Sequence, residues 1–306
     1  MPQLGHLWLG TVTAGGRNSG TDNSIVLIVN VGGDRTDNVH HTFGDTAQDD
    51  LERDQANIYE VTQDDIDTVT GFVPGTVDTD SLNTSSIRLA IRGNDAWTPK
   101  SVFVWGREQR EEGQVIPLAL VINLRRSIFI IGVLANVTLS TDTDEGPTSF
   151  LIPQVTLGGA SMLIRSLLVA MTTANEDDAG TDDPIRLRIT TADGRVVLDQ
   201  VMEDTEQDDQ EQGQANIYFI PVATAFTRAE LGERSIELSI EGDDDAWLPA
   251  NFFVFGLSAA LPSAFSPQVE PLVHVTTWPF GTMSTDEDEG RRTAILPLLP
   301  LSPTIP

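Results

Sequence analysis

Short runs of apolar and β-branched residues recur along the chain, and several alternate apolar and polar positions with a period of two. Examples are "SIVLIVNV" at 24–31, "SIRLAI" at 86–91, "IRLRIT" at 185–190 and "SIELSI" at 235–240. This period is typical of strands that are buried on one face. Clusters of Gly, Asn, Asp and Pro separate the runs, so the pattern predicts short antiparallel strands. A short helix is expected only at 227–233.

The chain contains an internal duplication, because three long segments recur in the same order and with similar spacing. "LWLGTVTAGGRNSGTDNSIVLIV" is followed about 160 residues later by "LLVAMTTANEDDAGTDDPIRLRI". "RDQANIYEV" matches "QGQANIYFI", and "SIRLAIRGNDAWTPKSVFVWG" matches "SIELSIEGDDDAWLPANFFVFG", which has one extra aspartate. Two looser repeats follow each copy, namely "QVIPLALV" with "QVEPLVHV" and "STDTDEGPTSFLIP" with "STDEDEGRRTAILP".

The pattern and the duplication predict an all-β chain with two antiparallel β-sandwich domains. We expect the first sandwich at 1–110, a strand-rich connector at 111–165, the second sandwich at 166–262 and a Pro-rich C-terminal arm at 263–306. The arm is expected to add strands to a neighbouring chain, because two strands alone are marginally stable. The alternative is that the arm packs back on its own sandwich.

The longest apolar stretch, 115–137, is interrupted by Pro117, Asn123 and the pair Arg125–Arg126. Two adjacent arginines would be costly in the middle of a bilayer. We therefore interpret this stretch as two buried strands joined by a turn. The N-terminal residues "MPQLGHLWLG" lack the features of a secretory signal.

The chain is strongly acidic, with 46 Asp and Glu against 18 Lys and Arg, and its net charge is −28. Such a surface repels nucleic acids and anionic lipids, so we expect no nucleic-acid partner and no membrane contact. Lys100 is the single lysine. This composition is typical of a protein in a high-salt environment, although a genomic base bias could also favour arginine. No cysteine is present, which excludes disulfides and thiol catalysis.

Acidic turns recur at matching places in the two copies. "DDAGTDDP" at 177–184 crowds Asp178, Asp182 and Asp183 around Gly180, and "NSGTDNS" at 18–24 is its counterpart. Calcium binds six to eight carboxylate and carbonyl oxygens in irregular geometry. Loops at one end of a sandwich converge in space, so Asp245 of "GDDDAW" could complete a site with Asp178.

The succession of "GTD", "ANIY" and "DAW" in each copy, with "AGTD" in the second, is interleaved with strands and resembles the PLAT/LH2 domain of lipoxygenases, some lipases and bacterial phospholipase toxins. The resemblance implies a sandwich of two four-stranded sheets, often with Ca2+ in the loops at one end. In the second copy it implies a ligand set of Asp178, Gly180, Thr181, Asp182 or Asp183, Asp245 and Ala246. In the first copy the implied set is Asn18, Gly20, Thr21, Asp22, Asp95 and Ala96. The first copy departs from the pattern at Asn18 and Asn23, so it should bind calcium more weakly.

Each of these features has a simpler interpretation. On so acidic a chain, an aspartate cluster can be a solvated face, and the runs at 203–211 and 286–289 are expected to be solvated loops. Trp97 and Trp247 follow the acidic turns directly. We expect both to lie in the core rather than to insert into lipid, because core positions repeat in duplicated folds.

The sequence shows no catalytic constellation: neither a G-x-S-x-G elbow nor a histidine metal motif is present. We therefore expect a non-enzymatic structural protein of a larger extracellular assembly from a high-salt environment. A virus particle is the expected setting, with the chain as a capsid, turret or tail component. Its expected partners are copies of itself and other particle subunits. A calcium-dependent module that binds lipid, glycan or protein is the alternative, and a hydrolase with an unrecognised carboxylate pair is a third interpretation.

Overall fold

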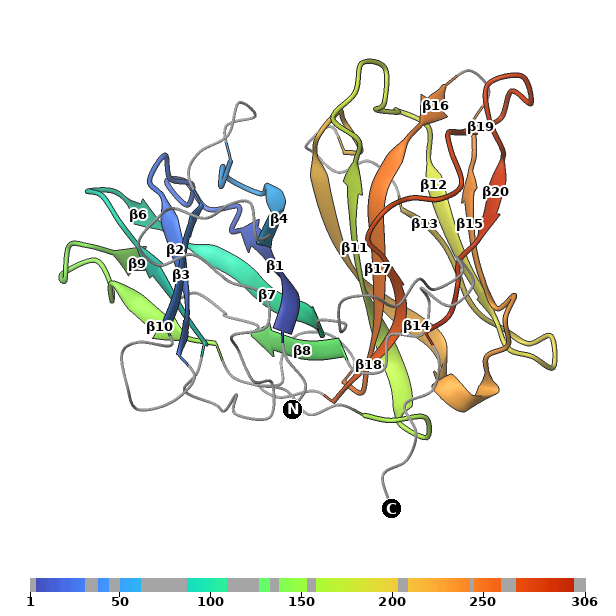
Figure 1. Cartoon of the computed structure of the whole chain (residues 1–306), viewed down its shortest axis with the longest axis horizontal. Helices are drawn as coiled ribbons and strands as arrows, with labels where there is room; N and C mark the ends of the chain where they lie inside the picture. Colours follow the sequence, from blue (N-terminus) through green and yellow to red (C-terminus); the bar gives the residue numbers. More distant parts are fainter. Residues whose placement is uncertain are drawn as a thin grey trace, which may run out of the picture. The chain divides into compact units, whose positions relative to one another are not determined.

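The computed structural model describes residues 4–30, 38–43, 50–61, 87–108, 127–132, 138–152, 158–202, 209–242, 245–259 and 268–299. The chain divides into two compact units, Met1–Val155 and Thr156–Pro306, each of which is described by itself. Nearly all regular structure in the described residues is β-strand (Figure 1). None of their helices is long and apolar enough to cross a membrane.

Unit 1 contains two groups of antiparallel strands and one short extra pair. The first group follows the order β4 (Ala56–Val61), β1 (Leu4–Thr13), β7 (Pro99–Glu108) and β8 (Ser127–Gly132). The second follows the order β10 (Ser149–Leu151), β5 (Ile87–Ile91), β2 (Ile25–Asn30) and β3 (Asn38–Phe43). The extra pair joins β6 (Ala96–Trp97) to β9 (Leu139–Ser140).

Unit 2 contains the equivalent elements. The first group follows the order β14 (Ala215–Thr227), β11 (Leu163–Thr173), β17 (Pro249–Leu257) and β18 (Val269–Val275). The second follows the order β20 (Thr293–Ile295), β15 (Ile236–Ile240), β12 (Ile185–Thr190) and β13 (Val196–Met202). The extra pair joins β16 (Ala246–Trp247) to β19 (Met283–Ser284).

The two units match strand for strand, including an irregularity. The register between β1 and β7 shifts between Val12 and Thr13, and that between β11 and β17 shifts between Thr172 and Thr173. In each case the strand partner beyond the shift is a proline, Pro99 or Pro249, which has no N–H for a ladder bond. The prediction of two antiparallel β-sandwich domains is confirmed.

The core of each unit lies between its two groups of strands. Within unit 2, Leu167 and Val169 from β11 cluster with Leu187 from β12 and Leu238 from β15, all at most 1 % exposed. Within unit 1, Leu9, Leu27 and Leu89 cluster in the same way. The alternating pattern of β5, β12 and β15 therefore places its apolar positions inward, as the sequence predicted.

The segments expected to be a connector and an arm belong to the sandwiches. Strands β8, β9 and β10 complete unit 1, and β18, β19 and β20 complete unit 2. After β20, the Leu296 N–H donates to the Ile236 carbonyl at 2.9 Å, and the Leu299 N–H donates to the Leu272 carbonyl at 2.8 Å. Over residues 268–299 the predicted arm therefore packs in cis. The physical reason is that β15 and β17 would otherwise be open edges, and a segment of the same chain covers them without the entropy cost of association.

Two smaller predictions concern 227–233 and 115–137. The first contains a 3-10 helix, η5 (Arg228–Glu230), where a short helix was expected. Of the second, residues 127–132 form strand β8, and residues 115–126 and 133–137 lie outside the described residues.

Candidate loop site at one end of each sandwich

Beneath the acidic turns of both units lies a set of buried hydrogen bonds among a Thr, a Trp and an Asn side chain and the neighbouring backbone, which we call the polar frame. In unit 2 the indole Nε1–H of Trp247 donates to Thr173 Oγ1 at 2.9 Å, and that hydroxyl donates to the Gln210 carbonyl at 3.0 Å. In unit 1 Trp97 donates to Thr13 at 3.0 Å, and Thr13 donates to the Leu51 carbonyl at 3.2 Å. Both tryptophans are 0 % exposed, so the prediction that they lie in the core is confirmed.

The repeated "QAN" sequence extends this frame. The Asn57 side chain accepts from the Leu51 N–H at 3.1 Å and donates to Asp50 at 3.3 Å. Asn216 makes the same two bonds with Gln210 and Asp209, at 3.1 and 2.9 Å. Leu51 and Gln210 have φ near +60°, a conformation that few residues other than Gly adopt without support. The side chains of Asn57 and Asn216 supply that support by bonding the strained backbone.

The turns above the frame are joined to each other by backbone amides and carboxylates in unit 2. The Asp245 carboxylate accepts from the N–H groups of Asp182 at 3.0 Å and Ala246 at 2.8 Å. The Asp245 N–H in turn donates to Asp183 Oδ2 at 3.3 Å. The structure thus brings together Asp182, Asp183, Asp245 and Ala246, four of the residues predicted to bind calcium.

The other predicted residues of unit 2 serve the turn itself. Thr181 is 2 % exposed, and its hydroxyl accepts from the Asp183 N–H at 3.0 Å. Gly180 packs closely against the next loop, because a Cβ there would lie 3.1 Å from the Gln212 nitrogen and would require the neighbouring backbone to shift slightly. Asp178 is exposed with φ of 60°, and no hydrogen bond among the described residues joins it to Asp245.

The predicted residues of unit 1 have the same placement with less charge. Thr21 accepts from the Asn23 N–H at 3.1 Å, and Asp95 accepts from the Ala96 N–H at 2.8 Å. The Asn23 side-chain oxygen, in the amide orientation that its neighbours require, accepts from the Asp95 N–H at 2.6 Å. Asn23 thus replaces Asp183 with the same contact.

The remaining three residues of the unit 1 set also follow the unit 2 pattern. Asn18 is exposed with φ of 62°, and Asp22 is exposed. Gly20 approaches the Arg53 nitrogen as closely as Gly180 approaches that of Gln212.

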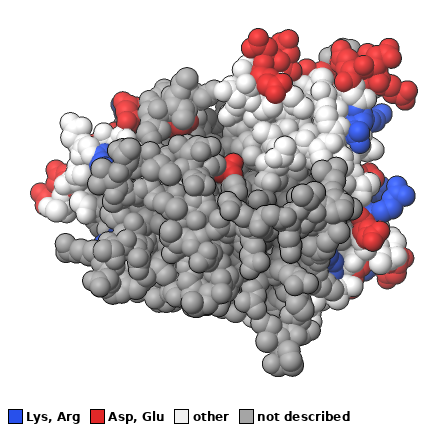
Figure 2. Space-filling view, viewed as in Figure 1, with Lys and Arg blue, Asp and Glu red and all other residues white. Residues whose placement is uncertain are grey.

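A third acidic turn lies at the same end, and sequence reasoning did not place it there. Strand β19 pairs Ser284 with Ala246, and β9 pairs Ser140 with Ala96. The turn that follows, 285–290 in unit 2, therefore starts beside the Asp245 turn. Figure 2 shows acidic side chains gathered at the end of unit 2 where β16 and β19 lie in Figure 1. The repeat "STD.DEG" could have indicated a third acidic turn in each unit. The sequence does not show which strand pairs with the residues before this turn, so it could not place the turn.

The third turn holds its shape with its own side chains in both units. Ser284 Oγ accepts from the Asp286 N–H at 3.0 Å, and Asp286 accepts from the Asp288 N–H at 2.9 Å. Ser140, Asp142 and Asp144 repeat these bonds at 3.0 and 3.0 Å. The side chains of residues 286–289 are exposed, which agrees with the predicted solvated loop.

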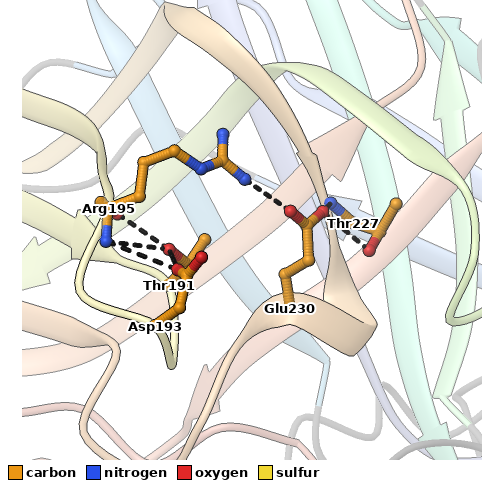
Figure 3. Close-up of polar contacts among 5 residues, drawn as sticks. All are labelled: Thr191, Asp193, Arg195, Thr227 and Glu230. Atoms are coloured by element: carbon orange, nitrogen blue, oxygen red, sulfur yellow. Dashed lines mark hydrogen bonds and ion pairs between the residues drawn. The ribbon is translucent and has the colours of Figure 1, made fainter.

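A hydrogen-bonded network of a different kind occupies the opposite end of unit 2, after β12 (Figure 3). Arg195 bonds Glu230, which also accepts from the Thr227 N–H at 2.6 Å. This backbone bond is the main cause of the lowered pKa of Glu230, and the Thr191 hydroxyl lowers the pKa of Asp193. The network joins the β12–β13 turn to η5 and has no role in the acidic turns.

Unit 2 buries two residues of opposite charge that interact electrostatically. Arg228 and Glu270 are each 7 % exposed, and Arg228 donates through Nη2 to the Leu299 carbonyl. Burial raises the pKa of Glu270, and the Gly159 N–H and the charge of Arg228 oppose that rise. At the equivalent register position of unit 1, opposite Gly106 on β7, β8 has Ile128.

The chemistry of the acidic turns allows either of two roles. Their carboxylates offer oxygens of the kind that calcium prefers, but Asp183 and Asp245 already accept backbone N–H groups. Among the described residues, no group of three or more His, Cys, Asp or Glu side chains is arranged to hold a metal ion. Calcium binding at these turns therefore stays a prediction.

Comparisons with known proteins add little to this picture. No family model matches the chain. No curated protein matches it either. Among solved structures, the alpha toxin from Clostridium absonum is similar with a TM-score of 0.29 and 19 % identity, over 36 % of this chain and 31 % of that one. The fold therefore rests on the strand pairings described above.

Proposed function

We propose that this protein is a non-enzymatic structural component of a larger extracellular assembly in a high-salt environment, with a virus particle as its setting. The observation that carries the proposal is the charge: 46 acidic against 18 basic residues on two fully packed sandwiches. Unscreened, this charge opposes both the compact state and the approach of like subunits. At molar salt the Debye length falls to about 3 Å, which removes most of that repulsion.

The use of polar residues at the loop ends supports a structural role. Thr173, Asn216 and Trp247 hold the turns in place through buried hydrogen bonds, and unit 1 repeats those bonds. Two units with the same frame give one chain two similar surfaces, which suits repeated contacts with copies of itself or other particle subunits. We assign both units to the PLAT/LH2-like sandwiches as part of this proposal, on the "GTD" and "DAW" turns that both contain.

Sedimentation velocity and thermal melting of the full chain in 0.15 M and 3 M KCl test the proposal. The melting temperature should rise with salt, and the chain should sediment as regular higher-order species in 3 M KCl. A monomer with an unchanged or lower melting temperature in 3 M KCl would contradict it.

A calcium-dependent binding module for lipid, glycan or protein is the second candidate. It is favoured by the contacts among Asp182, Asp183 and Asp245, which place three carboxyl-bearing residues at one end of unit 2. Under this candidate, millimolar CaCl2 should raise the melting temperature of the chain at constant ionic strength, while magnesium chloride has a smaller effect.

A further inference from the structure

The loop that precedes the third acidic turn of unit 2 carries a group of partly buried aromatic residues. Trp278 packs on Trp247 and Phe252 with ring centroids 6.4 Å apart in both cases. Phe280 meets Trp278 edge-on at 4.9 Å. Pro279 between them is exposed, and so is Gly281, which has φ of 72° and open space around it. The aromatic rings therefore have one side on the core and another toward solvent.

This loop has a fixed conformation. The Trp278 N–H donates to the Ala250 carbonyl at 2.9 Å, which ties the loop to β17. The Trp278 indole N–H donates to the Gly281 carbonyl at 2.8 Å, which closes the loop on itself. A surface whose conformation is already set loses little entropy when a partner binds.

The chain itself shows which chemical group fits the aromatic face. The guanidinium carbon of Arg291 lies 5.6 Å from the centroid of Phe280, within the range of a cation–π contact. Arg291 is exposed, and its backbone is held beside the loop by the Arg291 N–H bond to the Thr282 carbonyl at 3.1 Å. A guanidinium over this ring is thus compatible with the local backbone.

The carboxylates beside the loop add the complementary charge. Residues 286–289 are all acidic and exposed, and no Lys or Arg forms an ion pair with them within the described part of the chain. Asp286 and Glu289 take part in hydrogen bonds of the turn, whereas Glu287 and Asp288 have no side-chain bond of this kind among the described residues. Anionic lipid and nucleic acid would be repelled here, and a cationic segment would be attracted.

Unit 1 lacks this combination. In the sequence, Leu134, Ala135 and Asn136 stand where unit 2 has Trp278, Pro279 and Phe280, and Thr143 stands for Glu287. The third turn of unit 1 keeps the same internal hydrogen bonds, so the aromatic loop and the extra carboxylate are not needed for the fold.

We propose that Trp278, Pro279 and Phe280, together with the turn 286–289, form a docking surface for an arginine-containing basic segment of a partner protein. The guanidinium of the partner displaces that of Arg291 and takes its place over Phe280, and Glu287 and Asp288 attract its charge. The inference rests on the proposed function only in assuming that the chain has a protein partner.

The test is a titration of the full chain, labelled with 5-fluorotryptophan, with the peptide acetyl-GRGRG-amide. Four of the five tryptophans, namely Trp8, Trp97, Trp105 and Trp247, are at most 2 % exposed, so Trp278 is the expected reporter. Its 19F resonance should shift on titration at 0.1 M KCl, and the shift should weaken at 1 M KCl. An equivalent glutamate peptide and phosphatidylcholine vesicles should leave the resonance unchanged.

Variants locate the binding. Phe280→Leu should weaken the peptide about two- to fivefold through loss of the cation–π contact. Glu287→Gln with Asp288→Asn should weaken it about three- to tenfold, whereas Asp144→Asn in unit 1 should have no effect. The proposal is overturned if the peptide does not shift Trp278, if both unit 2 variants bind as well as the parent, or if vesicles give the same shift. If the chain binds the peptide but stays monomeric in 3 M KCl, this surface is supported and the proposed assembly is contradicted. If the chain assembles in 3 M KCl but does not bind the peptide, the assembly is supported and this surface is rejected.

Discussion

The loop ends of the two units have the same frame and different charges. Thr13, Trp97 and Asn57 make the bonds that Thr173, Trp247 and Asn216 make. The lengths differ by at most 0.2 Å, except that the bond from Asn57 to Asp50 is 3.3 Å and that from Asn216 to Asp209 is 2.9 Å. Above the frame, Asn23 and Asp183 both accept the backbone N–H of the aspartate in the "DAW" turn. A neutral amide thus does the same structural work as a carboxylate, so the extra negative charge of unit 2 is not required to hold its turns.

Unit 2 also has features without a counterpart in the sequence or the described residues of unit 1: the buried charges of Arg228 and Glu270, the aromatic loop and the additional aspartate of the "GDDDAW" turn. Arg228 holds the segment after β20 by donating to the Leu299 carbonyl. The comparison separates the structure that both units share from the features found in unit 2. Four experiments test this separation.

The largest effect is expected from Arg228→Met. It removes the charged side-chain donor to the buried Leu299 carbonyl and the nearby cation that opposes the rise in the pKa of Glu270, so the free energy of unfolding should fall by about 1.5–3 kcal/mol. Hydrogen exchange should speed up at Leu296 and Leu299 but not in β9 or β10 of unit 1. The double variant Arg228→Met with Glu270→Met should recover most of the loss, and a double variant no better than the single one would contradict the pairing.

The next effect tests whether the frames are equivalent. Thr13→Val and Thr173→Val each leave a buried indole N–H without its acceptor, at a cost of about 1–3 kcal/mol. Urea unfolding should give similar losses for the two variants, because the surrounding bonds are the same. A loss confined to one unit would show that its frame is not the equivalent structure we describe.

Calcium affinity should differ between the units if the predicted sites bind it. Unit 2 has Asp178 and Asp183 where unit 1 has Asn18 and Asn23, so the stronger site is expected in unit 2. Asp245→Asn should weaken that site by about tenfold or more, or about 1.4 kcal/mol, in calorimetric titration. Asp95→Asn should affect only the weaker site, and unchanged binding in both variants would reject this assignment of ligands.

The smallest expected effect is the pH dependence that Glu270 contributes. Its pKa is raised in the folded chain by burial, so the folded state holds the proton more tightly than the unfolded state. The stability advantage that follows is fully present below the ordinary glutamate pKa and is lost as pH rises through the raised pKa. The stability of the parent relative to Glu270→Gln should therefore decline over the pH range that begins at the ordinary glutamate pKa of about 4 and rises through the raised pKa of Glu270. A relative stability that rises over this range would contradict the direction of the shift.

Much of the fold could be predicted from the sequence because it depends on local pattern. The period-two alternation of "IRLRIT" and "SIELSI" determines which residues of β12 and β15 face the core. The sandwich fold indicated that the loops of Asp178 and Asp245 converge, and Asp245 does bond that loop, but at Asp182 and Asp183. The role of the repeated "QAN" could not be inferred, because the acceptor function of Asn57 depends on a φ of 64° at Leu51, six residues earlier.

The features that could not be predicted from the sequence depend mainly on pairing between residues far apart in the chain. The turn 285–290 could be recognised as a repeat, but its place beside Asp245 depends on the two-residue pair β16–β19. Glu270 and Arg228 are separated by 41 intervening residues, and the loose repeat "QVEPLVHV" that contains Glu270 carries no sign of a contact with Arg228. The cis placement of 268–299 likewise depends on which strand edge lies closest to this segment in the folded chain. The local sequence does not determine that.

Electron microscopy of the full chain in 3 M KCl tests the proposed structural role most directly. The protein is expected to form regular multimers, such as a lattice, ring or filament, in which neighbouring subunits make the same contacts throughout. Dispersed monomers in 3 M KCl, both in the purified protein and in material taken directly from its source, would contradict the proposed structural role.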